Sequence, residues 1–297
     1  MSRPSIHTTD VAQMEAHLRA LGLRAGLDVV VHSSLMAFGR LSVSEGQSGP
    51  EMVYQALRAV VGPEATVVVP SYTFNTHEAP YDVVHSPSTG VGALSEYVRT
   101  LPSAVRSMSP VHNHVAVGPR AEALMTPTPP TVSLGPDSDF ERLYAAQMHV
   151  VLLGVGFRRG CTYLHHMEAL AQVPYRQWLD LPRTVVDHSG EPRQVTLKYY
   201  ARADDPQGRQ WRANFDVIAE PLRRAGVLTE VAAPYGQSYA VAIADLHDCA
   251  LRMLTEDPYA LVTPIAPDNP IVSDNPIVSD NPIVSDNPIV SDNKVHP

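Results

Sequence analysis

The sequence predicts an α/β protein in which helices cover both faces of a mostly buried central sheet. Short, nearly continuous apolar runs, at residues 29–31, 65–69 and 149–155, alternate with segments of helical periodicity. A strand with one exposed face would show alternating polar residues, so these runs predict strands that are buried on both faces. Such strands between helices are typical of a layered α/β/α architecture.

Each expected element also has a local signal. Asp10 can cap a helix over residues 11–21, and Pro70 stops the second strand. The turn-forming residues 189–192 predict a hairpin between strands at residues 184–186 and 194–197. Further helices are expected over residues 49–61, 92–101, 161–172, 214–225 and 246–255, with a further strand over residues 239–243.

The chain divides into a domain at residues 1–264 and a low-complexity tail at residues 265–297. In the tail, Asn-Pro-Ile-Val-Ser-Asp occurs four times in tandem from Asn269 to Asp292. The proline in each unit forbids a helix and interrupts a strand ladder, which predicts a disordered tail. A short hexapeptide solenoid is the alternative, although four uncapped units make a poor core.

The composition narrows the classes of function. There are 31 acidic and 22 basic side chains, and the formal net charge of −9 argues against a nucleic-acid binder. Two cysteines exclude a disulfide scaffold, and no apolar run approaches the roughly 20 residues of a membrane span. Since the first ten residues lack an apolar signal core, we expect a cytoplasmic protein. We expect it to be a monomer or a homodimer.

Two short polar segments could bind an anion. His32, Ser33, Ser34 and Leu35 follow the first strand directly, where hydroxyls and backbone N–H groups can hold a phosphate. Arg106-Ser107 could hold a phosphate or a carboxylate. The alternatives are an ordinary serine-capped turn and a solvated loop.

His165 and Glu168 form the strongest catalytic candidate. Three residues apart on an expected helix, they share a face, so the carboxylate can bind one ring nitrogen. The other nitrogen can then remove a proton from an attacking amine or hydroxyl. The alternative is an exposed His–Glu pair without function.

Two other patterns carry less weight. Gly154, Gly156 and Gly160 resemble a dinucleotide-binding loop, but their spacing departs from GxGxxG and indicates tight backbone turning. His112, His114, His165, His166 and Glu168 could be imagined as a zinc site, but no HExxH motif occurs and ~50 residues separate the two groups of histidines. We therefore expect no metal.

An ordered series of short motifs resembles the aminoglycoside 3-N-acetyltransferase family, also called the antibiotic N-acetyltransferases. The series runs through residues 10–260 and combines turns at strand ends with two histidine-containing signatures. It consists of His32-Ser33-Ser34-Leu35 with Gly39, Ala56-Leu57, Pro70-Ser71-Tyr72-Thr73, Asp82 before Ser86-Pro87-Ser88 and Gly92, Arg106-Ser107 before Pro110, Leu152 to Gly156, and Leu164-His165 with Glu168 before Tyr175-Arg176.

The resemblance implies an acetyl-CoA-dependent transferase whose α/β scaffold differs from that of the GNAT acetyltransferases. It assigns His165 as the general base and Glu168 as the carboxylate that orients it. It places His32, Ser33, Ser34, Leu35, Arg106 and Ser107 in the site for acetyl-CoA. Tyr72 and Asp82 would face the acceptor, a small-molecule amine.

Two departures from the family pattern leave the acceptor open. Ser109 replaces the histidine of an RSxHP signature, and Asn113 replaces a common serine. Acidic side chains around the cleft would favour a polycationic antibiotic, and the sequence offers Glu45, Glu78, Asp82 and Glu96 without indicating which of them line it. The alternatives are a non-aminoglycoside acceptor, another acyl thioester as donor, and a catalytically silent acyl-CoA binder.

Overall fold

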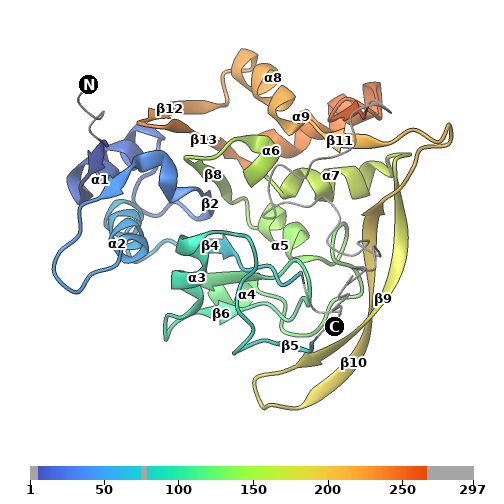
Figure 1. The fold of residues 1–297 in the computed structure, drawn as a ribbon, viewed down its shortest axis with the longest axis horizontal. Helices are drawn as coiled ribbons and strands as arrows, with labels where there is room; N and C mark the ends of the chain where they lie inside the picture. The colour runs from blue at the N-terminus through green and yellow to red at the C-terminus, as the bar shows by residue number, and fades with distance from the viewer. Residues whose placement is uncertain (1–5, 75–78, 266–297) are drawn as a thin grey trace, which may run out of the picture.

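The computed structural model describes residues 6–74 and 79–265, which fold in layers around a seven-stranded sheet (Figure 1). The repeats at 269–292 lie outside the described residues, so the disordered tail and the boundary near residue 264 stay predictions. No helix of the described ranges is long and apolar enough to cross a membrane.

The central sheet has the strand order β12-β13-β8-β2-β4-β7-β6. β2 lies between β8 and β4 and runs parallel to both, whereas β13 and β7 join antiparallel. The carboxyl ends of β2, β4 and β8 therefore meet at one edge of the sheet. The strands are β2 (Val29–Ser33), β4 (Val67–Pro70), β6 (Val105–Arg106), β7 (His114–Val117), β8 (His149–Leu153), β12 (Thr229–Ala233) and β13 (Gly236–Ala242).

Alternation along the central strands divides the hydrophobic core into two layers. Val30 and Val68 belong to one buried cluster, and Val29 and Val31 belong to the other. Side chains of the helices at residues 139–145, 163–171, 219–224 and 243–256 pack in the first layer, and those of the helices at residues 11–20, 49–61 and 93–99 in the second. Both faces of the sheet are thus covered, which confirms the predicted fold class.

The helices begin close to their sequence signals. Asp10 caps α1 and Ser48 caps α2. In each capping box the side chain of the third helical residue, Gln13 or Glu51, accepts a hydrogen bond from the backbone N–H of the capping residue. The helices are α1 (Val11–Ala20), α2 (Gly49–Val61), α3 (Ala93–Arg99), α4 (Ala121–Leu124), α5 (Asp139–Ala145), α6 (Phe157–Gly160), α7 (Tyr163–Ala171), α8 (Ala219–Arg224) and α9 (Ile243–Glu256), with 3₁₀ turns η1 (Leu35–Phe38) and η2 (Phe215–Ile218).

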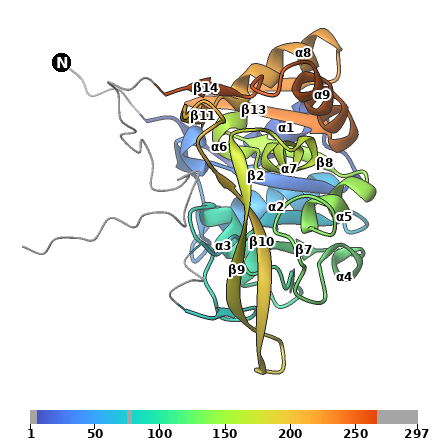
Figure 2. The same ribbon diagram turned by 90° about the vertical axis from the view of Figure 1, so that its right-hand side faces the viewer.

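A long hairpin stands beside the layered body (Figures 1 and 2). The sequence predicts two short strands around residues 189–192, whereas β9 (Arg176–Val186) and β10 (Pro192–Arg202) pair over eleven positions. Pro182 interrupts the sequence signal but is tolerated, because β5 (Tyr81–Asp82) pairs with β9 only at Val185 and Val186. The remaining strands are β1 (Thr8–Thr9), β3 (Arg40–Leu41), β11 (Trp211–Ala213) and β14 (Val262–Pro264).

Candidate active site

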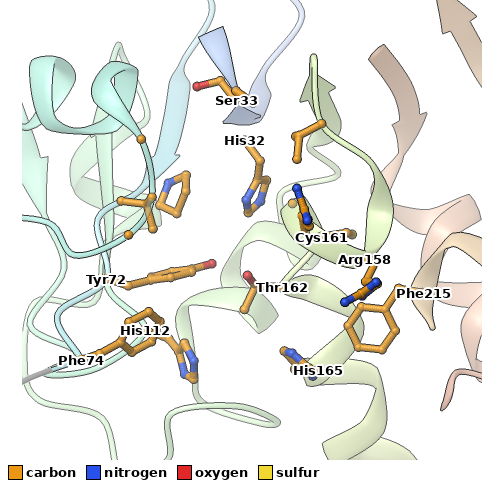
Figure 3. A pocket seen from close by; sticks show the side chains of 18 of the residues that line it. His32, Ser33, Tyr72, Phe74, His112, Arg158, Cys161, Thr162, His165 and Phe215 are labelled. Atoms are coloured by element: carbon orange, nitrogen blue, oxygen red, sulfur yellow. The ribbon is translucent and has the colours of Figure 1, made fainter. Parts of the chain in front are cut away.

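A cavity of about 400 Å³ opens where β2, β4 and β8 end. The segments that follow these strands line it, together with the start of α3, the first turns of α7 and residues of the β9–β10 hairpin. Ligands of open α/β sheets bind at this position, beyond the carboxyl ends of the strands. Figure 3 shows Ser33 and His32 toward one end of the cavity, and His112 and His165 toward the other.

His165 and Glu168 meet on α7 at the inner end of the cavity. Nδ1 of His165 lies 2.7 Å from Oε2 of Glu168, as their spacing of three residues predicts. A carboxylate can only accept a hydrogen bond, so Nδ1 carries the proton of the neutral ring. The basic nitrogen of His165 is then Nε2.

The Glu168 carboxylate is fully buried among donors. Tyr175 donates its hydroxyl to Oε1 at 3.0 Å, and the guanidinium Nε of Arg176 lies 2.8 Å from Oε2. Burial raises the pKa of this carboxyl, but the charge of Arg176 and the bonds from His165 and Tyr175 outweigh it and leave the pKa below its usual range. Glu168 is therefore ionised at neutral pH and fixes the orientation of the imidazole.

Arg176, at the start of β9, is a site residue that the motif analysis did not assign. Its Nη1 donates to the carbonyl of Tyr200 at 3.1 Å, and its Nη2 lies 2.8 Å from Nδ1 of His165. With Nδ1 protonated toward Glu168, the second contact brings a positive charge to the ring rather than a hydrogen bond. The hairpin thus supplies the counter-charge of the buried carboxylate.

The end of the cavity around Ser33 suits an anion with an apolar arm. Ser33, Ser34 and Leu35 line it together with the buried His32. The exposed residues Arg158 and Arg159 border the same cavity. Guanidinium and hydroxyl groups match phosphate oxygens, and the leucine offers apolar contact.

The glycines after β8 shape this wall. Gly154 has a φ of +71°, and a Cβ there would lie 2.6 Å from Cβ of Ala37 and 2.7 Å from the carbonyl oxygen of Ser34. A side chain is therefore excluded on two grounds. The predicted tight turn is confirmed.

Aromatic rings form the wall around His165. Tyr72, Phe74, His112, Tyr199 and Phe215 line the cavity there, and the ring of Phe215 packs edge-on to His165 with centroids 4.8 Å apart. Of these, only Tyr72 was expected to face a substrate. No short motif marks Tyr199 or Phe215, because strands and turns far apart in the sequence bring them together.

Arg106 does not line the cavity, although the resemblance assigns it to the acetyl-CoA site. Its buried guanidinium donates to Oδ1 of Asn113 at 3.0 Å and to the carbonyls of Ser86 and Ser71 at 2.5 and 2.8 Å. Arg106 therefore holds three chain segments together. Asn113, the departure from the family pattern, is one of its acceptors.

Ser107 likewise lies outside the cavity lining and belongs to a buried polar cluster. Ser107 and Thr126 donate their hydroxyls to Oδ1 of Asp139 at 2.7 and 2.6 Å. The backbone N–H and Nδ1 of His114 both lie 3.2 Å from Oδ2. Ser109 joins through its backbone N–H, which donates to the Ser107 hydroxyl at 3.1 Å.

This cluster predicts a loss of stability in Asp139→Asn. The amide presents N–H groups where the fold supplies donors, so we expect the free energy of unfolding to fall by about 1–3 kcal/mol. Chemical denaturation of the full chain measures it. The matched control is Asp137→Asn, at an exposed position with a φ of +71° that asparagine also tolerates, and an equal loss there would contradict the prediction.

The described lining of the cavity contains none of the acidic side chains that the sequence offers for binding a cation. Asp82 accepts hydrogen bonds from the backbone of Val84 and His85, away from the cavity lining. Glu96 binds Ser88 and Arg99, and Glu45 is exposed outside the lining. Glu78 lies outside the described residues. No three His, Cys, Asp or Glu side chains in the described ranges are placed to hold a metal ion.

Comparison with known proteins identifies the family. The family model for aminoglycoside 3-N-acetyltransferase matches residues 30–255. Aminoglycoside N(3)-acetyltransferase VII of Streptomyces paromomycinus is 32% identical over 258 residues, which cover 77% of this chain and 83% of the relative. The crystal structure of aminoglycoside acetyltransferase AAC(3)-Xa superposes with a TM-score of 0.71 at 29% identity, over 84% of this chain and 93% of that one.

A third comparison concerns a structure with a bound nucleotide. The structure of AAC-IIIb in binary complex with CoASH has the same fold, with a TM-score of 0.69 at 23% identity, over 84% of this chain and 97% of that one. The family model spans most of the chain, and its members are named for acetyl transfer. The chain therefore belongs to the aminoglycoside 3-N-acetyltransferase family and is an acyltransferase.

Proposed function

We propose that this protein transfers an acetyl group from acetyl-CoA to an amine of an aminoglycoside or a related amino compound, with His165 as the general base. The observation that carries the proposal is the His165–Glu168 pair at the inner end of the cavity, with 2.7 Å between Nδ1 and Oε2. Bound acetyl-CoA supplies an acetyl group already activated as a thioester. The chain's residues must then position the amine and remove its proton.

Proton removal falls to Nε2 of His165. The carboxylate of Glu168 holds the ring in the required tautomer and stabilises the imidazolium once the proton arrives. A positioned base of this kind contributes roughly 10²–10⁴-fold to the rate. Nothing in this scheme needs a covalent acyl-enzyme, so acceptor and donor occupy the cavity together.

The residues of the Ser33 end fit a CoA thioester. Arg158 and Arg159 can neutralise phosphate groups, while Leu35 and Val155 offer apolar contact along the cavity. Ser33 and Ser34 add hydroxyl donors. This arrangement directs the thioester toward His165 and the aromatic wall, where the acceptor amine would meet it.

One observation favours a second class of acceptor, an amine that is not a polycation. The described lining of the cavity contains Arg158, Arg159 and Arg176 but no aspartate or glutamate. Multiply charged aminoglycosides gain affinity from carboxylates, and aromatic walls instead favour an acceptor with an apolar face. A non-aminoglycoside amine is therefore the second candidate substrate.

A panel of amines distinguishes the two candidates. Thiol release from acetyl-CoA is measured with several deoxystreptamine aminoglycosides, other amino sugars and simple amines of differing charge. We expect thiol release that depends on the amine. Faster release with polycationic aminoglycosides would identify them as the acceptor class, and faster release with amines of low charge would identify the second candidate. If CoA binds but no amine releases thiol, the chain is a silent acyl-CoA binder and the proposal fails.

A further inference from the structure

Acetyl transfer needs a hydrogen-bond donor as well as a base. As the amine nitrogen attacks, negative charge develops on the thioester oxygen, and a fixed donor at that oxygen raises the rate about 10²–10³-fold. His165 cannot fill this role, because its task in the proposed function is to accept a proton. The donor must therefore come from another wall of the cavity.

His112 is placed to be this donor. It lies in the segment between β6 and β7 and lines the cavity on the wall of Tyr72, across from the helix that carries His165 (Figure 3). Its ring stacks on Tyr199 with centroids 5.7 Å apart at 14° and meets Tyr72 edge-on at 5.3 Å. Packed in this way and only 4% exposed, the imidazole has a fixed orientation.

The two ring nitrogens of His112 have different surroundings. Nδ1 is sealed from solvent and has no hydrogen-bond partner among the described residues, so Nε2 is the nitrogen open to the cavity. A buried N–H without an acceptor is rarer in folded proteins than a buried acceptor without a donor. The proton therefore sits on Nε2 and points into the cavity.

The ring is also neutral. Burial, together with the charges of His165, His114 and Arg176, holds the pKa of His112 well below its usual range. A neutral imidazole donates through Nε2–H but does not give its proton up. It can hold a negative oxygen while His165 performs the proton transfer.

We propose that Nε2–H of His112 donates a hydrogen bond to the carbonyl oxygen of the acetyl thioester. This inference rests on the proposed function of the cavity. The amine lone pair forms the new N–C bond, and the carbonyl electrons move onto the oxygen held by His112. They return to re-form the carbonyl as the C–S bond breaks, the CoA sulfur leaves with the electron pair of the C–S bond, and it receives the proton that His165 took from the amine.

The test compares His112→Phe with His112→Gln. Phenylalanine keeps the stacking on Tyr199 but removes the donor, so we expect kcat to fall roughly 10²–10³-fold with little change in the Kd for CoA. Glutamine restores an N–H donor and should recover part of that loss. A His112→Phe variant with nearly normal kcat would overturn the inference.

A spectroscopic measurement tests the same bond without turnover. In a His165→Ala background, the infrared stretch of isotope-labelled acetyl-CoA carbonyl should lie at a lower frequency than in the His112→Phe, His165→Ala double variant. Equal frequencies would refute the role of His112 and leave the proposed function standing. Failure of the wild-type protein to bind acetyl-CoA would instead refute the proposed function, so the two failures are distinguishable.

Discussion

We expect His165→Ala to lower kcat by at least about 100-fold. Nε2 is the basic nitrogen of the neutral ring, because Glu168 holds Nδ1 at 2.7 Å. Without it, the protonated form of the acceptor amine dominates at neutral pH and cannot attack the thioester. Thiol release under saturating acetyl-CoA measures the change.

Two variants make this result specific. His188→Ala, in the exposed turn of the hairpin, should leave kcat unchanged. Glu168→Gln should lower kcat as well, because the amide no longer stabilises the imidazolium and leaves Arg176 without its buried counter-charge. Turnover that survives in His165→Ala would remove His165 as the base.

We expect the fold to lose stability on acidification before its carboxylates are protonated, because two buried histidines resist protonation. Burial, with a contribution from His114, lowers the pKa of His32 to about 3, and burial, with a contribution from His247, lowers that of His166 to about 3. Glu141 lies 3.8 Å from Nε2 of His166, but its side chain is partly exposed and does not offset burial. Both histidines are neutral in the folded protein.

The sign follows from proton linkage. Both folded pKa values lie below the unfolded value of about 6.5, so the stabilisation is complete above pH ~6.5 and is lost as the pH falls toward 3. Each group loses about 1.36 kcal/mol per pH unit, which is ~4 kcal/mol for the two together at pH 5. Domains have only about 5–15 kcal/mol in total, so the effect is large.

Urea denaturation of the full chain at pH 7 and pH 5 measures this loss. His166→Gln removes one of the two titrating groups while its side-chain oxygen can still accept from Gly135, which now donates to Nδ1 at 3.0 Å. Its free energy of unfolding should depend less steeply on pH. His188→Gln is the exposed control, and an identical slope in all three proteins would contradict the prediction.

Local patterns predicted the parts of the molecule that depend on neighbouring residues. The capping residue Asp10, the apolar strands and the turn at Gly154 all follow from a few adjacent positions. The approach of His165 to Glu168 is of the same kind, because helical geometry alone brings residues three apart together. The structure also shows what lies around the pair, which no spacing could give.

Long-range pairing decided the features that the sequence left open. Arg176 reaches His165 only because β9 folds back beside α7, and Tyr199 reaches the cavity through the pairing of β10 with β9. For Arg106, polarity suggested a ligand site, yet its hydrogen bonds go to buried groups of its own chain. A sequence motif does not distinguish an arginine that binds a ligand from one that hydrogen-bonds to buried groups of neighbouring loops.

The two walls of the cavity belong to different sheets of the fold. The Ser33 wall is anchored in the central sheet, where a close contact such as that of Gly154 with Ala37 tolerates little substitution. Tyr199 comes from a hairpin outside that sheet, whose strands pair mainly with each other. Because Arg176 of the same hairpin holds Glu168, divergence in the accepted amine would fall on other positions of the hairpin, with the Ser33 wall unchanged.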